Sequence, residues 1–566
     1  MTFALTSLPQ TPPTQPTIRF RDISHEAGLN TLPPSPLQKK YLVEMMGGGI
    51  ALFDCDNDGK LDILTVNDSS VDRYLQGGEP MVTLYHQDAP LHFSDITLKS
   101  GLTTKGWGMG IAIGDYDNDG LPDIYVTGYG HNVLYHNLGG CKFQDVTEQA
   151  HVASGGFSVG AAWADYNRDG HLDLFVSRYV YTDINHLPGP GNKGFGYRGI
   201  DIEQPVAHDG YPDQLFRNRG DGTFEEVGAK AGVGNPEKRL GMGVTWAGYD
   251  DDGWPDLFVT NDMSANYFFH NKRDGTFEDL GVSSVVTVGE QGEFLGNMAV
   301  DFGDIYHDGT LSPVLTRYAH QPLSLYHYDR SQGFVDDTYL SGLGHVDRNM
   351  TRWGVGFADF DNDGWNDLLV ANGNFTPLID ALPTDPRYSE PILLFRNQGE
   401  GKFSDVSDAS GLNRGSLHSR RGTAFGDINN DGNIDVVTYN VGAPPSLFLY
   451  ETKNANHRVL FRLVGTRSNK AAIGARVTIT TAPPAGSPTS GSISRIDEVR
   501  GGGSYLSTSD QRLHFGLGSA TTMTHVQIRW PSGLIEDLKD VPADAIYTIV
   551  EGRGIQQTTK LPTPPR

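Results

Sequence analysis

Short apolar segments separated by polar turns recur along the whole chain. Residues 50–53 and 63–66, on either side of one polar loop, read as a pair of strands and not as helices. The rest of the chain divides into repeating units, and the pattern predicts four strands in each unit. In one unit these are an inner strand rich in Gly and Ala at 107–113, a second at 124–127, a third at 132–137 and an outer strand that starts with a Phe-x-Asp phrase at 143–147.

The outer-strand phrase begins at Phe20, Phe93, Phe143, Phe277, Phe334 and Phe403, and a seventh copy at Phe224 has Glu226 in place of the Asp. Its first copy precedes every other element, and no copy follows the seventh unit. We therefore expect the strand at Phe20 to complete the last unit and close a ring, which removes the exposed sheet edges. The pattern predicts an all-β fold, a seven-bladed β-propeller.

An acidic loop joins the first and second strands of each unit. In Asp54-Cys55-Asp56-Asn57-Asp58-Gly59-Lys60-Leu61-Asp62, carboxylates stand at positions 1, 3, 5 and 9 and a glycine at position 6. Calcium prefers such oxygen ligands, and the carbonyl at position 7 can add another. An EF-hand would need Glu at position 12, where this chain has Thr65. A single acidic loop could be an ordinary turn, but its repetition indicates calcium binding.

The seven loops begin at residues 54, 115, 165, 248, 304, 359 and 427. Two are degenerate: Gly248 replaces the first carboxylate of one, and Tyr306 and Ser312 replace two carboxylates of another. We expect about five well-formed Ca²⁺ sites and one or two degenerate ones. The predicted ligands are Asp54, Asp56, Asp58, Lys60, Asp62, Asp115, Asp117, Asp119, Leu121, Asp123, Asp165, Asn167, Asp169, His171, Asp173, Asp250, Asp252, Asp256, Asp359, Asp361, Asp363, Trp365, Asp367, Asp427, Asn429, Asp431, Asn433 and Asp435.

Composition and charge agree with this interpretation. The 70 Gly and 32 Pro among 566 residues fit a turn-rich β protein. The net charge is −25, and the loops hold about a third of the 69 acidic side chains. An acidic chain without a basic run is a poor candidate for nucleic-acid binding, and no segment is long enough to span a bilayer. The two cysteines, Cys55 and Cys141, fall at different places in the repeat, so we expect them to lie far apart without a disulfide.

The C-terminal part contains Gly-rich and apolar phrases at residues 456–469, 472–477, 501–507, 512–518 and 530–533. With these phrases the whole chain resembles the cartilage-acidic-protein family. The repeats resemble the FG-GAP/VCBS type of the integrin α-chain propeller, and the C-terminal phrases match the ASPIC/UnbV signature. The resemblance implies a calcium-binding propeller, a small β-sandwich-like C-terminal domain and a secreted or cell-surface setting. We expect a flexible tail at 1–17, the propeller at 18–452, the ASPIC/UnbV domain at 453–551 and a disordered tail at 552–566.

Ligand recognition is expected on the face opposite the acidic loops. Long insertions at about 181–212 and 373–391 belong to that face, and cations precede several inner strands. We expect a polar or anionic small molecule, a glycan or a protein to bind at this mouth; ordinary solvated loop cations are the alternative. The candidate residues are Arg178, Tyr179, Arg239, Arg317, Tyr318, Arg352 and Arg421.

An enzyme acting on a small molecule at the same mouth is the competing interpretation. Familiar catalytic motifs are missing, and the best acid/base candidates are His208, near Asp209 and Asp213, and Tyr318 beside Arg317. Loops of this calcium-binding type suit an extracellular or periplasmic location, although the apolar stretch near residue 3 is too short for a signal peptide core. We expect a monomeric binding protein.

Overall fold

The computed structural model describes residues 18–33, 35, 39–281, 284–289, 291–346, 349–383, 386–483 and 491–563, so the expected tail at 1–17 lies outside the described residues. Strands dominate, as predicted for an all-β fold. The helical elements are short: α1 (Leu42–Met45), α2 (Val71–Leu75), α3 (Thr97–Ser100), α4 (Gly228–Ala231), η1 (Pro205–Ala207), η3 (Leu343–His345), η4 (Pro377–Ala381) and η5 (Ser407–Ala409). None of the helices in the described part has the length and apolar character needed to cross a membrane.

Seven sheets share one topology, in which four antiparallel strands run from an inner to an outer edge; they follow chain order except in the last sheet, whose outer strand comes from the N-terminus. Blade 1 contains β2 (Ile50–Phe53), β3 (Asp62–Val66), β5 (Val82–Ala89) and β6 (His92–Asp95). Blade 2 contains β7 (Lys105–Gly114), β8 (Asp123–Tyr129), β9 (Val133–Asn137) and β10 (Phe143–Asp145), with β4 (Glu79–Pro80) added beside β7. Blade 3 contains β11 (Ser158–Ala164), β12 (Asp173–Arg178), β15 (Gln214–Asn218) and β16 (Phe224–Glu226). Blade 4 contains β17 (Leu240–Ala247), β18 (Asp256–Asp262), β19 (Tyr267–Asn271) and β20 (Phe277–Asp279).

The remaining blades follow the same order. Blade 5 contains β21 (Asn297–Gly303), β22 (Ser312–Arg317), β23 (Ser324–Asp329) and β24 (Gly333–Asp336). Blade 6 contains β25 (Arg352–Ala358), β26 (Asp367–Asn372), β27 (Leu393–Asn397) and β28 (Phe403–Asp405). Blade 7 contains β29 (Arg420–Gly426), β30 (Asp435–Asn440) and β31 (Ser446–Tyr450), and its outer strand is β1 (Phe20–Asp22).

The N-terminal strand closes the ring. Strand β1 pairs antiparallel with β31, with Phe20 opposite Tyr450, so the expected closure is confirmed. The inner strands are neighbours in the cyclic order β2, β7, β11, β17, β21, β25, β29 and back to β2. Ala and Gly on these strands allow the close approach at the axis; a Cβ on Gly110, for example, would lie 2.5 Å from the Val159 carbonyl oxygen.

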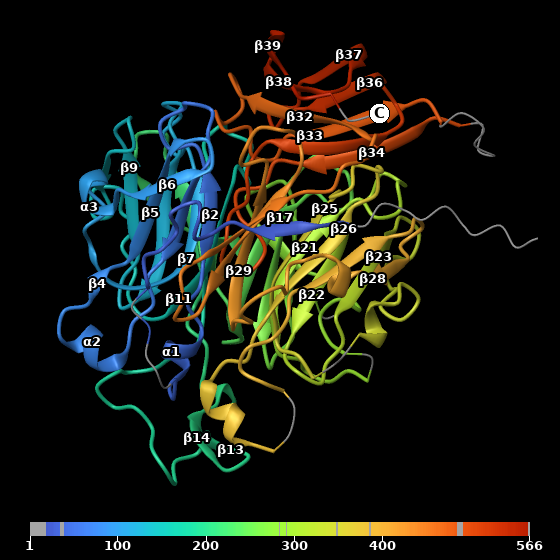
Figure 1. Ribbon diagram of the computed structural model, residues 1–566. Coiled ribbons are helices and arrows are strands. Elements are labelled where there is room, and N and C mark those ends of the chain that lie inside the picture. Colours follow the sequence, from blue (N-terminus) through green and yellow to red (C-terminus); the bar gives the residue numbers. More distant parts are fainter. Residues whose placement is uncertain are drawn as a thin grey trace, which may run out of the picture.

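Residues 457–560, the C-terminal unit, form two further four-stranded sheets (Figure 1). One has the order β35 (Leu513–Gly518), β32 (His457–Val464), β38 (Ala545–Val550) and β39 (Gly554–Lys560). The other has the order β34 (Ile493–Glu498), β33 (Arg476–Thr481), β36 (Thr522–Arg529) and β37 (Ile535–Pro542). Side chains of both sheets, among them Phe461 and Ile528, share one buried cluster with Trp163 of blade 3. The apolar core therefore continues from the propeller into the C-terminal unit.

The disordered tail expected from residue 552 is a wrong prediction. Strand β39 pairs with β38, with Lys560 opposite Ala545, and Leu561 is buried. Residues 554–560 contain β-branched side chains that suit an edge strand, and the Pro-rich composition after residue 560 concealed this.

Residues 499–512, which we call the finger, leave the C-terminal unit and enter the centre of the ring. Gly501 bridges to Trp163, Ser504 to Val300 and Thr508 to Ala51, so the finger touches inner strands of blades 3, 5 and 1. Its tip residue Tyr505 is fully buried. The axis of the propeller is thus filled by the chain's own C-terminal segment and is not an open channel.

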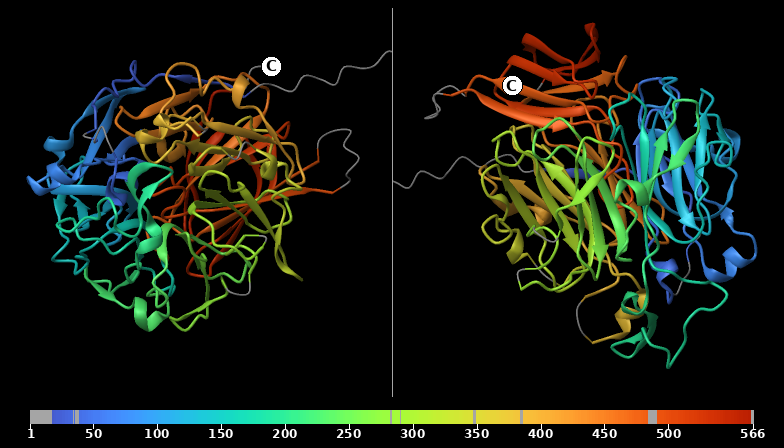
Figure 2. Two further views of the ribbon diagram at one scale, coloured as in Figure 1. Left: turned by 90° about the horizontal axis from the view of Figure 1, so that it is seen from below. Right: turned by 180° about the vertical axis from the view of Figure 1, so that it is seen from behind.

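The two ends of the ring differ. Strands of the C-terminal unit lie at one end, and α1 with the hairpin β13 (Phe195–Tyr197) and β14 (Ile200–Glu203) lies at the other (Figures 1 and 2). Since the loops between first and second strands are on the side of the C-terminal unit, the acidic loops lie beneath that unit.

Candidate functional site

The intact acidic loops share one hydrogen-bonding pattern. In loop 1 the Asp54 carboxylate accepts from the backbone N–H groups of Asp58 (3.0 Å) and Gly59 (2.8 Å). Asp62 accepts from the N–H of Cys55 at 3.0 Å and from that of Gln87 at 2.8 Å, which ties the loop to the third strand. The same bonds recur in the loops beginning at residues 115, 165, 359 and 427.

The loop carboxylates converge in the way that a divalent cation requires. Asp54, Asp56 and Asp58 each place an oxygen within 4.8 Å of the others, and the equivalent residues of loop 2 do the same. Burial, with the nearby Asp123 carboxylate, raises the pKa of Asp115 to about 7. Such crowding is unfavourable without a cation, and an all-oxygen donor set fits Ca²⁺. The residues therefore fit the ion that the sequence predicts.

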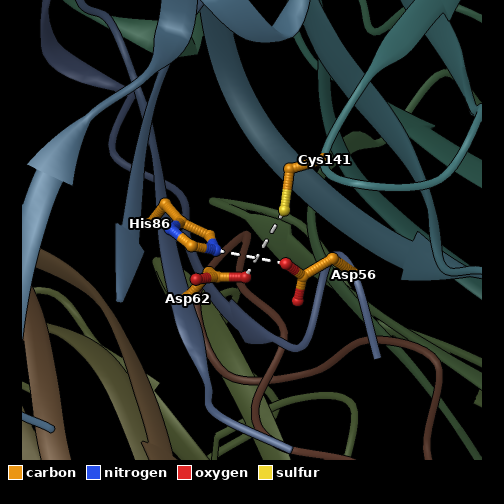
Figure 3. Close-up of side chains that lie close together, drawn as sticks. All are labelled: Asp56, Asp62, His86 and Cys141. Atoms are coloured by element: carbon orange, nitrogen blue, oxygen red, sulfur yellow. Dashed lines mark hydrogen bonds and ion pairs between the residues drawn. The ribbon is translucent and has the colours of Figure 1, made fainter. Parts of the chain in front are cut away.

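A side chain on the third strand of most blades also faces the acidic loop, and the sequence analysis missed it. His86 Nε2 lies 3.3 Å from Asp56 Oδ2 in blade 1, and Figure 3 shows both pointing toward each other beside Asp62. The equivalent contacts are His136–Asp117, His270–Asp256, His327–Asp308 and Arg396–Asp361. The available signal was the His or Arg that recurs after the aromatic residue of the third strand, as in Tyr85-His86, Tyr135-His136 and Phe395-Arg396.

The degenerate loops are held by protein groups. In loop 4, Glu498 of the C-terminal unit accepts from the Gly248 N–H at 3.1 Å, next to the place of the missing first carboxylate. Arg273 contacts Asp252 at 2.6 Å. In loop 5, Asp304 accepts from the Ile496 N–H at 2.9 Å. The C-terminal unit thus contributes to both loops that lack ligands.

The prediction that the two cysteines are unpaired is wrong. Cys55 and Cys141 form a disulfide, with their Cα atoms 5.1 Å apart. The hairpin that follows the third strand of one blade abuts the acidic loop of the preceding blade, as the 2.9 Å bond from Asn137 Nδ2 to the Cys55 carbonyl shows. Cys141 appears beside Asp62 in Figure 3, but a disulfide sulfur is no thiolate and offers no ligand for a metal.

The face opposite the acidic loops carries a cap. It consists of residues 39–46, 181–212 and 373–383. The Leu42 N–H donates to Glu203 at 2.9 Å, and Thr376 donates to the Lys39 carbonyl at 2.8 Å. Three segments far apart in the sequence therefore support one another over this end of the ring.

The predicted ring of exposed cations differs from the structure, because the cap and the finger cover it. Arg352 and Arg421 are fully buried, and Arg317 is 2% exposed. The Arg421 guanidinium stacks on Trp353 at 4.0 Å and donates to the carbonyl of Met45 at 3.2 Å. Arg421 also donates to the carbonyl of Asn374 and so holds two segments of the cap, whereas Arg317 and Arg352 donate to groups of blade 5 and its loop. The role of these arginines in ligand binding stays a prediction.

The other predicted ligand residues are also engaged within the protein. Arg178 stacks on Tyr211 at 4.4 Å, and Arg239 stacks on Tyr267 at 4.0 Å. Tyr179 is buried and donates to Asp262 at 2.5 Å. Tyr318 is half-buried and donates to the hydroxyl of Tyr197 at 3.3 Å.

The acid/base candidates have separate partners. His208 Nε2 faces Glu203 at 3.0 Å, Asp209 pairs with Lys238 at 2.8 Å, and Asp213 is buried and accepts from the Arg178 N–H at 2.7 Å. The contacts that the structure shows for these groups do not form a catalytic relay.

A groove of about 650 Å³ lies beside the cap. It runs between the segments around Val206, Lys238, Met263 and Phe294. The three apolar members are exposed: Val206 by 61%, Phe294 by 59% and Met263 by 40%. Lys238 pairs with Asp209 and Arg239 with Glu237, so the cations of the rim are neutralised. The groove therefore favours apolar contact over the recognition of an anion.

Comparisons with known proteins agree with the fold. The FG-GAP-like repeat family matches residues 54–126, 115–176 and 248–312, and the ASPIC and UnbV family matches residues 465–556. Cartilage acidic protein 1 of Mus musculus is 25% identical over 360 residues, which are 62% of this chain and 50% of that protein. The Homo sapiens protein is 26% identical over 330 residues, 57% of this chain and 45% of that protein.

The chain thus contains FG-GAP-like repeats and an ASPIC and UnbV domain, and it is homologous to cartilage acidic protein 1. It spans about half the length of the curated relatives that it matches. Solved structures that the comparison matches include an Agrocybe aegerita lectin that recognises non-reducing terminal N-acetylglucosamine, with a TM-score of 0.36 and 16% identity over 64% of this chain and 81% of that one. Another is BBS1N in complex with ARL6DN, with a TM-score of 0.37 and 9% identity over 74% and 98%.

Proposed function

We propose that this chain is an extracellular, calcium-stabilised β-propeller interaction protein whose partner binds in the groove on the face opposite the acidic loops. Homology to cartilage acidic protein 1 and the FG-GAP-like repeats support an interaction role. The disulfide supports an oxidising compartment. The observation that carries the proposal is the groove, because its volume falls in the range of ligand sites and it gathers three exposed apolar side chains.

We propose a protein partner that inserts apolar side chains between Met263 and Phe294. The paired rim charges offer no net attraction to an anion, and exposed apolar surface rimmed by polar groups is typical of protein contacts. Arg239 is the arginine that lines the groove, and its guanidinium is paired with Glu237 and stacked on Tyr267.

The groove is tested by screening immobilised extracellular proteins, with a glycan array in parallel, against the full chain and two variants. Phe294→Glu places a charge in the groove, and we expect binding to fall at least tenfold. Leu98→Glu is the matched control, because Leu98 is 73% exposed on α3, outside the groove. A ligand whose affinity is the same for both variants would show that recognition occurs elsewhere.

The calcium part of the proposal has its own test. Elemental analysis is expected to find several Ca²⁺ ions per chain, and EGTA is expected to lower the unfolding temperature, since an ion that binds only the folded state stabilises it. Loops 1, 2 and 6 keep all four carboxylates and are expected to bind best. A calcium-free protein with an unchanged melt would refute the structural role of the ion.

A further inference from the structure

The fourth position of every acidic loop has a left-handed backbone. The φ angles at this position lie between 55° and 65° for Asn57, Asn118, Arg168, Asp251, His307, Asn362 and Asn430. This conformation is unfavourable for side chains other than Gly, Asn and Asp, yet Arg168 and His307 adopt it too. Position 4 stands between ligand positions 3 and 5 in the sequence, so a change in the spacing of those two side chains acts on it directly.

Position 4 links neighbouring loops. The amide of Asn57 donates to the carbonyl of Gly120 at 2.9 Å, that of Asn118 donates to the carbonyl of Gly170 at 2.9 Å, and that of Asn430 donates to the carbonyl of Gly59 at 2.8 Å. Loops 7, 1, 2 and 3 therefore form a hydrogen-bonded chain around the ring.

The same amides also contact the C-terminal unit. Asn57 Oδ1 accepts from Arg462 at 2.8 Å, and Asn430 Oδ1 accepts from Arg512 at 2.6 Å. Asn118 Oδ1 accepts from the backbone N–H of Lys470 at 2.7 Å. The side-chain nitrogen of each asparagine thus donates to the next loop, and its side-chain oxygen accepts from the C-terminal unit. Both hydrogen bonds therefore depend on the backbone conformation of the same residue.

Blade 4 has a different anchor. Its position-4 residue, Asp251, pairs with Arg476 at 2.8 Å and with Arg529 at 2.7 Å, and Arg476 also pairs with Glu498 at 2.7 Å. This loop lacks the first carboxylate, because Gly248 stands there. Its contact with the C-terminal unit is made by two arginine side chains in place of an asparagine amide.

We propose that calcium binding and docking of the C-terminal unit are coupled through position 4: the calcium-loaded loops of blades 7, 1 and 2 form a docking surface whose partner is the chain's own residues 457–560. Without the ion, the clustered carboxylates repel one another, positions 3 and 5 separate, and the asparagine between them loses its direction. The anchor at blade 4 persists. This inference rests on the calcium binding proposed above and adds a consequence for the second part of the chain.

Thermodynamic linkage makes the coupling reciprocal. If calcium strengthens docking, then docking strengthens calcium binding by the same factor. A variant that weakens the docking contact without touching a calcium ligand must therefore lower the affinity for calcium.

Hydrogen exchange of the full chain, with calcium and with EGTA, tests the first half of the proposal. The Lys470 N–H reports directly on docking, because its acceptor is Asn118. We expect EGTA to increase exchange at least tenfold in peptides covering 466–472 and 510–516. Peptides covering 495–498, which contact blades 4 and 5, are the internal reference and are expected to change less.

The double variant Asn57→Gly/Asn430→Gly tests the second half. Glycine keeps the left-handed backbone and removes only the bridging amides. We expect calcium affinity, measured by titration calorimetry, to fall severalfold and exchange in the two peptides to rise with calcium present. His151→Gly is the matched control, since His151 is exposed, has a φ of 61° and lies outside the acidic loops. It is expected to change neither quantity.

The outcomes separate this inference from the proposed function. Calcium bound in several equivalents, with exchange at 466–472 and 510–516 unaffected by EGTA, overturns the coupling and leaves the calcium-stabilised propeller standing. A double variant that binds calcium as tightly as the parent also overturns it. A chain that binds no calcium removes the premise itself. Circular dichroism establishes that each variant is folded, and the EGTA comparison on the unaltered chain needs no variant.

Discussion

Removing the disulfide between Cys55 and Cys141 is expected to destabilise the protein strongly. The two residues are separated by 86 positions, and both side chains are buried. The chain-entropy relation for a loop of that length gives a loss of about 4.6 kcal/mol, near the upper end of the effects measured for disulfides. The bond joins blade 1 to blade 2. Its loss raises the conformational entropy of the unfolded chain, while the other contacts between the two blades in the folded state remain.

Equilibrium unfolding in guanidinium chloride, followed by both circular dichroism and tryptophan fluorescence, measures the effect. Coincident transitions are needed before a free energy is extracted for a chain of 566 residues. The oxidised protein is compared with the same protein unfolded in a thiol-free reductant, which leaves both sulfur atoms in place and breaks only the cross-link. The variant Cys55→Ala/Cys141→Ala gives a second value, which includes the loss of two buried sulfur atoms.

A loss below about 1 kcal/mol under reduction would refute the reasoning, because the entropy relation then fails for this loop. Free thiols in the native protein, detected by mass spectrometry after alkylation in denaturant, would refute the pairing itself. Preserved stability of the alanine variant together with a destabilised reduced protein would show that the buried thiols, and not the cross-link, cause the change.

Two further predictions concern the C-terminal unit and the finger. Burial alone would raise the pKa of Glu551, but Ser532 and the consecutive backbone N–H groups of residues 466–468 lower it to about 2. The ionised Glu551 carboxylate therefore contributes about 3 kcal/mol to the free energy of unfolding above the unfolded pKa near 4.5, and this contribution is lost as the pH falls toward 2. Glu551→Gln should lower the free energy of unfolding most at pH 7 and little at pH 2. A cost that does not change with pH in urea unfolding would contradict this. Tyr505 donates to the Met46 carbonyl at 2.6 Å and packs edge-on against Trp353, with ring centroids 4.9 Å apart. Tyr505→Phe should cost about 1–2 kcal/mol and Tyr505→Ala about 3–5 kcal/mol of unfolding free energy, whereas equal costs would show that the hydroxyl dominates.

The repeat could be predicted from the sequence because its signals are local. A loop such as Asp54–Asp62 contains its own turn glycine and its own carboxylates, and the strands on either side are short and apolar. The strand at Phe20 carries the same phrase as six later strands, which is enough to place it in blade 7. The histidines of the third strands also recur from unit to unit, but the sequence does not show what they contact. The structure shows that they face the acidic loops, as His86 does Asp56.

The disulfide and the buried arginines depend on contacts between units. In the other blades the position after the first carboxylate is often aromatic and packs on the next blade, as Tyr116 does on Phe224 and Tyr166 on Phe277. Cys55 stands at this position of loop 1, and its partner Cys141 lies on blade 2, two residues before Phe143, which is the equivalent of Phe224 and Phe277. The pair can be found only by comparing neighbouring blades. The sequence predicts Arg421 as a loop cation because residues 39–46 and 373–383, which cover it, are distant in the sequence.

The finger limits what calcium removal can do. Between Gly501 and Thr508 it is enclosed by inner strands of several blades, and its tip reaches Met46 in the cap. A segment held in this way cannot leave the ring without opening it. Loss of calcium is therefore expected to loosen the rim of the C-terminal unit over blades 7, 1 and 2, while residues 501–508 of the finger and the Arg476 anchor hold. The same finger connects the acidic-loop face to the cap, because the Met46 carbonyl accepts from Tyr505 and the adjacent Met45 carbonyl accepts from Arg421. Tyr505→Phe is the variant that interrupts this connection with the smallest change in packing.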